Sequence, residues 1–348
     1  MQGFSIIIVS WNALHYLKEY LPSVAETNYD QFEIILADNN SEDGSAEWVE
    51  QNYPDIKVAR LDKNYGYCGG NNRAVPYSKY DKLIFLNNDV KVDENWLTAL
   101  EHAFDEPDVA AAQPKLRAIE HPDHFEYAGA AGGFMDKYGF PFCQGRVFDH
   151  VEKDEGQYEM ARDIFWASGA ALAIRKELFT GSGGFDEDFE FHMEEIDLCW
   201  RLQNLGYRIR YAPGSIVYHL GGGSLPMGSP RKVYYNFRNS LFMLWKNYSA
   251  ASLLIRLPIR LKMDVLAAYK ALFSGNPKEW WAIARAHLHF VASLGKMNKK
   301  RKVLKNKRIH GSDPENMYNV SVVWRYFIGG KKTFSEIVPE TAIEQVSQ

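Results

Sequence analysis

The chain has 348 residues, 46% of them hydrophobic and 14% aromatic, with a formal net charge of −4; it can form a full core and is too acidic for a nucleic-acid-binding globule. Its three scattered cysteines exclude a disulfide framework, and no CxxC pair indicates a zinc site, so we expect a reducing, cytoplasmic setting. The N-terminus lacks the basic region of a signal peptide, and no run of about 18 apolar residues predicts a membrane span.

The first 110 residues alternate strand and helix signals, as a parallel α/β unit does. The expected strands are 4–10, 32–37, 56–61 and 82–86, and the expected helices are 14–27 and 44–52. In such a sheet a ligand binds outside the carboxyl ends of the strands. Asp38, the Gly/Asn-rich loop 64–72 and Asp89 all follow predicted strands, so this edge is the first candidate site.

Residues 110–175 have a more irregular pattern, with strands expected near 125–134 and 163–174. A helix follows from about 193 to 205, and Gly206 is a suitable residue to end it. We then expect a strand over 208–211 and a loop that leads to His219.

Asn87, Asn88 and Asp89 directly follow an apolar strand. A carboxylate at a strand end can bind a divalent cation, which neutralises a diphosphate as the bond to it breaks. The same residues are common turn formers, so a polar strand-to-turn junction is the alternative. His219 stands in the sequence YHLGGGSL, where glycines allow close approach to a ligand and a neutral imidazole can complete a metal site.

Glu194 and Glu195 fall in the first turn of the predicted helix. A carboxylate there can act as general base toward an acceptor hydroxyl, although negative charge at a helix N-terminus also has a purely structural explanation. Asp197 and Arg201 are four residues apart, so we expect them to pair on one face of this helix as a structural feature.

Seven motifs occur in order along the chain: SIIIVSWN, ADNNSEDGS, NYGYCGGNNRA, FLNNDV, FWASGAALAIRKELFTGSGGFDEDF, HMEEIDLCWRLQNLGYRIRY and YHLGGGS. Together they resemble the family 2 glycosyltransferases, particularly the rhamnosyltransferase-like branch, over about residues 4–245. The resemblance implies a GT-A fold, which is a Rossmann-like α/β fold with a mostly parallel central sheet flanked by helices. Here a helical C-terminal extension would follow it.

The resemblance also implies roles for individual residues. Asp38 matches the carboxylate that contacts the nucleotide base. Asp89 matches the last acid of the Asp-X-Asp metal motif, and Asn87 and Asn88 stand at the two preceding positions. His219 matches a histidine that contacts the metal or the diphosphate, so Mg²⁺ or Mn²⁺ is the implied cofactor.

Glu195 matches the catalytic base, which is usually the Asp of a Glu-Asp pair, so Glu194 stays open as the alternative. Trp166, Gly169 and Ala170 match the segment that lines the acceptor side. We expect the loop NYGYCGGNN to wrap a ribose or phosphate. The remaining candidate substrate contacts are Asn64, Gly66, Asn72 and Asn88.

The hypothesis that follows is an inverting, metal-dependent transfer of a sugar from a UDP- or dTDP-linked donor to a hydroxyl of a glycan or lipid-linked glycan. Glu195 would take the acceptor proton while Asp89 and His219 hold the ion at the leaving diphosphate. A nucleotidyltransferase, one alternative, would need a Gly-rich loop with Lys or Arg after the first strand, where the chain reads SWNALHYL. A non-catalytic sugar-nucleotide or polysaccharide-binding protein is the other alternative.

Composition divides the chain near residue 230. We expect a catalytic domain over 1–230, with a nucleotide-sugar half at about 1–110 and an acceptor half at about 111–230, and then a mainly helical region over 231–348. Residues 231–310 hold 18 Lys and Arg against 2 Asp and Glu. Such an excess of positive charge predicts an anionic partner for this segment.

Residues 251–295 carry apolar residues at helical spacing with basic residues about every turn, and KMNKKRKVLKNKR follows at 296–308. Charges that frequent exclude a spanning helix but suit a helix that lies in a membrane interface, with Trp280 and Trp281 at the headgroup level. We therefore expect peripheral contact with an anionic membrane surface. The alternative is that these helices pack on the catalytic core or on a second subunit of a homodimer.

Overall fold

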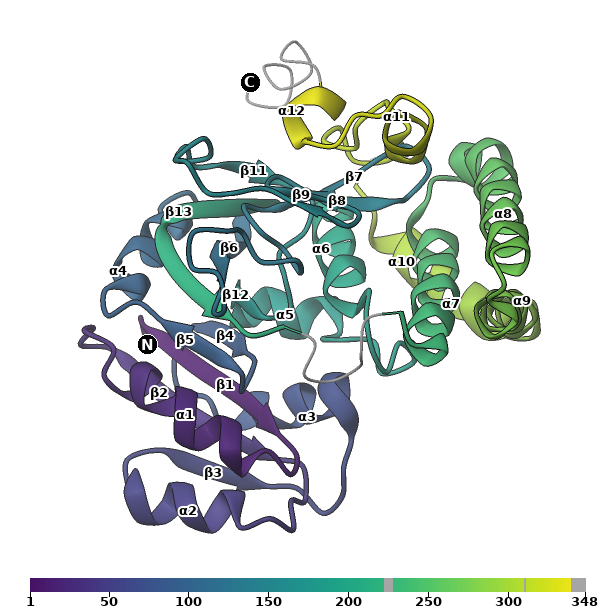
Figure 1. The fold of residues 1–348 in the computed structure, drawn as a ribbon. Coiled ribbons are helices and arrows are strands. Elements are labelled where there is room, and N and C mark those ends of the chain that lie inside the picture. The colour runs from purple at the N-terminus through teal and green to yellow at the C-terminus, as the bar shows by residue number, and fades with distance from the viewer. Residues whose placement is uncertain (222–227, 310, 339–348) are drawn as a thin grey trace.

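The computed structural model describes residues 1–221, 228–309 and 311–338. It shows a curled central sheet flanked by helices, with the N-terminal elements at one end and the helices of the C-terminal region stacked against one side (Figure 1).

The main sheet is mixed. Its strands are β1 (Phe4–Ser10), β2 (Phe32–Asp38), β3 (Lys57–Arg60), β4 (Lys82–Leu86), β5 (Val90–Val92), β6 (Val109–Ala118), β11 (Arg162–Ile164), β12 (Ala171–Arg175) and β13 (Arg208–His219). They follow the order β11-β13-β6-β12-β4-β1-β2-β3, and β5 pairs with β13. The four strands β3, β2, β1 and β4 are parallel. β12 runs antiparallel to β4 and β6, while β6 and β13 are parallel.

Three helices of the catalytic region begin and end close to where the sequence pattern places them, and these are α1 (Leu14–Ala25), α2 (Ser45–Asn52) and α6 (Glu194–Asn204). Three more helices, α3 (Gly66–Ala74), α4 (Trp96–Glu101) and α5 (Lys176–Ser182), were not predicted. The apolar side chains of β1 and β4 are buried, because helices cover both faces of these parallel strands. The predicted α/β sheet flanked by helices is therefore present.

Three local predictions are wrong. Most of the predicted loop 64–72 belongs to helix α3, and a Cβ atom built on Gly70 would lie only 2.9 Å from Cγ1 of Val9. Glycine at position 70 thus allows α3 to pack directly on β1. The strand predicted over 208–211 continues as β13 to His219, because it pairs with β6 over 208–212 and, after an irregularity, again over 216–219.

The third wrong prediction concerns the strand near 125–134. Only Gly133–Met135 is a strand there, and it belongs to a second, smaller sheet. This antiparallel sheet has the order β10-β9-β8-β7. Its strands are β7 (Gly133–Met135), β8 (Pro141–Cys143), β9 (Arg146–Val147) and β10 (His150–Val151).

The C-terminal region is helical and shares a core with the catalytic region. Its helices are α7 (Pro230–Asn247), α8 (Ala250–Phe273), α9 (Pro277–Ala292), α10 (Leu294–Lys307), α11 (Val322–Phe327) and α12 (Phe334–Ile337). Tyr248, at the end of α7, stacks edge-on against Trp200 of α6 with 5.2 Å between ring centroids. α8 and α9 lie outermost (Figure 1). None of the helices described is both long enough and apolar enough to cross a bilayer.

Candidate active site

A cavity of about 500 Å³ opens where the sheet, the segment after β6 and the start of α6 meet. Six of the predicted site residues line it. These are Asp89, Gly169, Ala170, Glu194, Glu195 and His219. They come from the turn after β4, the segment before β12, the first turn of α6 and the end of β13, so only the folded chain brings them together.

Asp89 and His219 meet because β5 and β13 pair. The register places Val90 opposite His219, and the backbone N–H of Leu220 donates to the carbonyl of Asp89 at 3.1 Å. Oδ1 of Asp89 consequently lies 3.2 Å from Nε2 of His219. Both side chains are buried, with 8% and 7% of their surface exposed.

Glu126 is a part of this site that the sequence pattern does not indicate. Its Oε1 lies 3.3 Å from Nδ1 of His219, on the side of the ring opposite Asp89. Burial disfavours the charged imidazole, but Glu126 first and Asp89 second outweigh it, and the pKa of His219 rises to about 10. Glu126 stands in an irregular segment without periodicity or a turn signal, so no local feature marks it.

The Asp89–His219 pair fits part of a metal coordination shell. When two ligand atoms each lie about 2.1 Å from the same ion, they are roughly 3 Å from each other. The distance between Oδ1 of Asp89 and Nε2 of His219 matches this separation. A carboxylate on the far nitrogen of a ligating histidine, as Glu126 provides, is the usual partner that orients such a ring. Within the described residues no group of three or more His, Cys, Asp or Glu side chains is arranged to hold an ion alone. Oxygens of a substrate would have to complete the shell.

Glu194 and Glu195 occupy the first turn of α6, and an oxygen of each is buried without a hydrogen-bond partner in the described structure. Burial, and then the neighbouring Glu195, raise the pKa of Glu194 well above its usual range. Burial also raises the pKa of Glu195 to about 7, although backbone N–H groups at the helix start lower it. Near neutral pH, Glu195 can therefore hold or release a proton.

The backbone that leads into α6 is strained. Glu190, His192 and Met193 have positive φ angles of 62°, 65° and 74°. Non-glycine residues rarely adopt this conformation, and such strain gathers at functional sites where the surrounding structure enforces it. The strained turn places the two glutamates at the cavity wall.

Two further residues of the cavity wall, Tyr67 and His192, stand in motifs of the family resemblance but had no predicted role of their own. Tyr67 of α3 donates its hydroxyl to the carbonyl of Gly169 at 2.7 Å, which joins the two halves of the catalytic region. His192 lines the cavity beside the glutamates, and burial, with a smaller effect of Lys232, lowers its pKa to about 4. Lys232 belongs to α7, so the C-terminal region contributes to the cavity as well.

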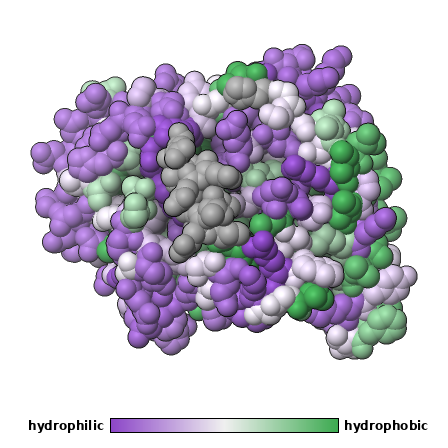
Figure 2. All heavy atoms as spheres, turned by 90° about the horizontal axis from the view of Figure 1, so that it is seen from above, coloured by the Kyte–Doolittle hydropathy of each residue, from purple (hydrophilic) through white to green (hydrophobic). Residues whose placement is uncertain are grey.

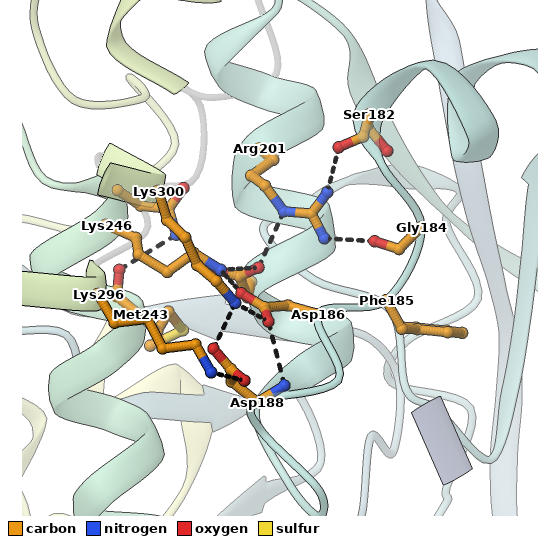
Figure 3. Close-up of polar contacts among 12 residues, drawn as sticks. Ser182, Gly184, Phe185, Asp186, Asp188, Arg201, Met243, Lys246, Lys296 and Lys300 are labelled. Carbon is orange, nitrogen blue, oxygen red and sulfur yellow. Dashed lines mark hydrogen bonds and ion pairs between the residues drawn. The ribbon is translucent and has the colours of Figure 1, made fainter. Parts of the chain in front are cut away.

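A network of charges fixes the segment before α6 (Figure 3). Lys246 of α7 contacts Asp186 at 2.5 Å and Asp197 at 2.9 Å, and all three side chains are buried. Arg201 pairs with Asp197 at 2.8 Å, as the four-residue spacing predicts, and also donates to the carbonyls of Ser182 and Gly184 at 2.7 Å.

The basic run of α10 takes part in the same network. Lys300 contacts Asp186 and lies 2.6 Å from Asp188, which also contacts Lys296 (Figure 3). Part of the polybasic patch that was expected to face a membrane therefore forms ion pairs with the catalytic region. Arg301 donates to the carbonyls of Trp245 and Tyr248 at 2.7 Å, which shows the same use of a basic side chain.

Asp38, Gly66 and Asn88 lie at the carboxyl edge of the parallel strands and not on the cavity wall. Asp38 ends β2, is 3% exposed and pairs in register with Ser10 of β1. Asn88 donates to Oγ of Ser10 at 3.3 Å. The carbonyl of Gly66 accepts from Asn39 at 3.1 Å. These contacts assemble the predicted nucleotide edge from three strand ends and the start of α3.

The other predicted contacts have structural partners. Trp166, expected to line the acceptor side, lies in the core against Gly133, and its indole N–H donates to the carbonyl of Phe134 at 3.0 Å.

The side-chain amide of Asn72 forms two hydrogen bonds with the backbone of Phe185. It donates to the carbonyl at 2.8 Å and accepts from the N–H at 2.9 Å. Asn64 is exposed and accepts from the N–H of Gly66 at 2.8 Å, which shapes the entry to α3.

The glycines after His219 are only partly described. Gly221 lines the cavity, and a Cβ atom there would lie 2.9 Å from Oε1 of Glu126, so the backbone passes close to this carboxylate. Residues 222–227, with the rest of the glycine run, lie outside the described residues.

Comparison with solved structures concerns the fold. One similar solved structure is that of GalNAc-T7 with UDP, GalNAc and Mn²⁺, which has a TM-score of 0.55 at 18% identity and covers 72% of this chain and 49% of that one. The mannosyltransferase PcManGT from Pyrobaculum calidifontis, with GDP-Man and Mn²⁺, has a TM-score of 0.52 at 14% identity. The match covers 88% of this chain and 86% of that one. These likenesses confirm the GT-A fold.

Comparison with curated proteins gives two informative relatives. O-antigen biosynthesis protein RfbC of Myxococcus xanthus is 30% identical over 189 residues, which is 53% of this chain but 15% of that protein. An N-acetylglucosaminyl-diphospho-decaprenol L-rhamnosyltransferase of Mycobacterium tuberculosis is 28% identical over 234 residues, or 62% of this chain and 75% of that protein. The chain therefore spans only a small part of the first relative and about three quarters of the second.

The family model described as "Glycosyl transferase family 2" matches residues 5–179, from the first strand to the helix that follows β12. The match covers half of the chain and includes the strand ends that carry Asp38 and Asp89. The chain therefore belongs to glycosyl transferase family 2.

Proposed function

We propose that this protein transfers a sugar, with inversion of configuration, from a UDP- or dTDP-linked donor to a hydroxyl group of a glycan or lipid-linked glycan. The observation that carries the proposal is one cavity lined by Glu195, by Glu194 and by the Asp89–His219 pair. Family membership supports sugar transfer over the nucleotidyltransferase alternative.

Glu195 is the proposed general base. A base that works near neutral pH needs a pKa near the operating pH, and burial raises that of Glu195 to about 7. Its partnerless oxygen is available to an acceptor hydroxyl. Burial, and then the neighbouring Glu195, raise the pKa of Glu194 as well. The base is assigned to Glu195 because this residue matches the catalytic base of the family, and Glu194 is given a binding role.

The leaving diphosphate is proposed to bind at Asp89 and His219. A divalent cation bound there would neutralise negative charge that develops on the departing diphosphate. Asp89 would supply a carboxylate oxygen, His219 would supply Nε2 after releasing the proton that Glu126 and Asp89 hold on its ring, and Glu126 would orient the ring. Mn²⁺ accompanies the nucleotide in two structures with the same fold, GalNAc-T7 and PcManGT, and this supports the metal in the proposal.

The acceptor is proposed to be a glycan precursor, either free or linked through phosphate to a lipid. The names of the two relatives, an O-antigen biosynthesis protein and a rhamnosyltransferase for a diphospho-decaprenol substrate, support this class of acceptor. Among donors, the second name favours an activated rhamnose.

The test starts with binding. Each of a panel of UDP- and dTDP-sugars is added with Mn²⁺, and the donor is identified as the compound that raises the melting temperature, because a ligand of the folded state stabilises it. Release of nucleoside diphosphate is then measured with N-acetylglucosaminyl-diphospho-polyprenol as acceptor. We expect turnover that EDTA abolishes and Mn²⁺ or Mg²⁺ restores.

Two controls make the outcome decisive. Glu195→Gln should retain donor binding while turnover falls by about 10²-fold or more, because the general base is lost. NMR of the product should show the anomeric configuration opposite to that of the donor. Retained configuration would contradict an inverting reaction, and full activity in EDTA would exclude the metal.

A further inference from the structure

Helix α8 has its polarity reversed relative to an ordinary surface helix. Arg260 and Asp264 face inward, only 3% and 1% exposed, and form an ion pair at 2.8 Å. Arg260 also donates to the carbonyl of Gly139 at 2.9 Å, and His287 of α9 lies 3.3 Å from Asp264. A helix on a water-exposed surface normally turns its charged residues outward.

The outward side of α8 is apolar instead. Leu254, Leu266 and Phe273 are 79%, 68% and 85% exposed. Large contiguous apolar patches are rare on proteins that meet only water, and they mark surfaces that contact a partner or a membrane. The two buried charges of α8, Arg260 and Asp264, have partners inside the protein, and its outer side carries mainly apolar residues.

The apolar surface continues onto two neighbouring helices. α9 exposes Trp281, Leu288 and Val291, and α11 exposes Trp324, Phe327 and Ile328. Nζ of Lys270 on α8 lies 4.7 Å from the ring of Phe327, which shows that α8 and α11 are adjacent. We call the surface formed by these exposed residues of α8, α9 and α11 the outer face. Figure 2 shows hydrophobic residues along the side of the molecule on which α8 and α9 lie in Figure 1.

Positive charge borders the outer face. Lys262 and Lys270 project from α8 among the apolar residues. Between α7 and α9 a cavity of about 330 Å³ is lined by Arg231, Lys278 and Arg285 together with Tyr234, Tyr235 and Trp281. Within the described part of the chain, none of its three cations forms an ion pair with a carboxylate, so an anion from outside can bind them.

Negative charge is nearly absent from the same region. Residues 250–309 contain two carboxylates, Asp264 and Glu279. Asp264 is buried in its ion pair, and Glu279 accepts a hydrogen bond from the side chain of Asn276 at 2.8 Å. The outer face thus combines exposed apolar and aromatic side chains with unbalanced positive charge.

We propose that the outer face docks on an anionic lipid bilayer, with its apolar side chains among the headgroups and a lipid phosphate in the cavity between α7 and α9. Apolar side chains, tryptophans and surrounding cations are the features that hold a helix in a membrane interface. A two-fold dimer through this face would bring the same cations together, which like-charge repulsion opposes. The proposal concerns binding and does not depend on the transfer chemistry.

Vesicle sedimentation of the full chain, without donor or acceptor, tests the proposal. We expect binding to vesicles that contain phosphatidylglycerol to exceed binding to pure phosphatidylcholine by about 10-fold or more, since each cation near an anionic surface adds about 1 kcal/mol. High salt should weaken it, because added ions screen the charges. Replacing Leu254, Leu266 and Phe273 together by Ser should lower binding to the anionic vesicles by about 10-fold or more.

Matched variants separate this surface from general effects. Met160→Ser removes an equally exposed apolar side chain, 82% exposed, far along the chain, and should leave vesicle binding unchanged. Lys278→Gln with Arg285→Gln should weaken binding more than Lys302→Gln with Lys305→Gln, which removes the same charge from α10. The substituted apolar residues are exposed, so the melting temperature of the triple variant should match that of the parent chain.

Three results would overturn the proposal. They are absence of binding to anionic vesicles at low salt, unchanged binding of the triple variant, and a dimer in light scattering that the triple variant loses. The last result would make a second copy the occupant of this surface. Since no substrate is present, none of these outcomes bears on the proposed sugar transfer.

Discussion

The carboxylate of Asp89 lies 3.2 Å from Nε2 of His219, across the pairing of β5 with β13. The short strand β5 directly follows Asp89, and its antiparallel register with β13 fixes where His219 must lie. The geometry is thus set by backbone pairing and not by flexible side chains, which suits a site that must present two ligands in a fixed arrangement.

The pH dependence of turnover tests the role of Glu195. The base must be ionised, and burial raises its pKa to about 7. Below that pH, kcat/KM should rise about tenfold per pH unit, and above it the profile should level off. The measurement is initial rate against pH with the identified donor, and a profile that is flat between pH 5.5 and 8 would speak against Glu195 as the base.

Glu126→Gln tests the residue behind His219. Removing the charge that orients the imidazole should weaken Mn²⁺ binding by about 10–100-fold, the usual effect of losing such a partner. Titration of Mn²⁺ with nucleoside diphosphate present, followed by electron paramagnetic resonance, measures the affinity for Mn²⁺ without any turnover. Glu120→Gln is the control, because this exposed carboxylate stands nearby in the sequence. Equal affinities in the two variants would show that Glu126 does not support the site.

Asp38→Ala tests the nucleotide edge. A hydrogen bond to a charged group contributes about 1.5–3 kcal/mol, so nucleoside diphosphate should bind about 10–100-fold more weakly. Calorimetry without metal measures the loss directly. Glu42→Ala is the control, because Glu42 is an exposed acid on the same loop. This variant should bind nucleoside diphosphate as tightly as the parent chain does. If both variants keep the parent dissociation constant, Asp38 does not contact the nucleotide.

Lys246→Met tests the charge network before α6. It leaves the buried carboxylates of Asp186 and Asp197 short of a cation, and breaking a buried ion pair costs about 3–5 kcal/mol of stability. Denaturant unfolding should show this loss. Lys302→Met, on the exposed side of α10, should change stability by about 0.5 kcal/mol or less. Similar unfolding curves for both would mean that the network does not stabilise the fold.

Local sequence patterns were sufficient for the parallel part of the sheet and for α6. Apolar runs predict β1 and β4 because both lie between covering helices, and the spacing of apolar residues predicts α6 within one residue at each end. Asp38, Asp89 and Glu195 could be proposed because each stands at a recognisable strand end or helix start. The prediction for α3 was wrong because glycine usually marks a loop, whereas here it allows close packing.

The sequence by itself thus determined the order of the elements and which side chains stand at their ends, because those features depend on neighbours a few residues away. Only the tertiary structure decided that Glu126 stands behind His219, that Trp166 lies in the core, and that Lys300 contacts Asp186. It also decided which side of α8 faces outward. Apolar residues at helical spacing mark one side of a helix, but the spacing is the same whether that side faces the protein or its surroundings. These relationships come from strand register and helix packing between distant segments, and no local pattern encodes them.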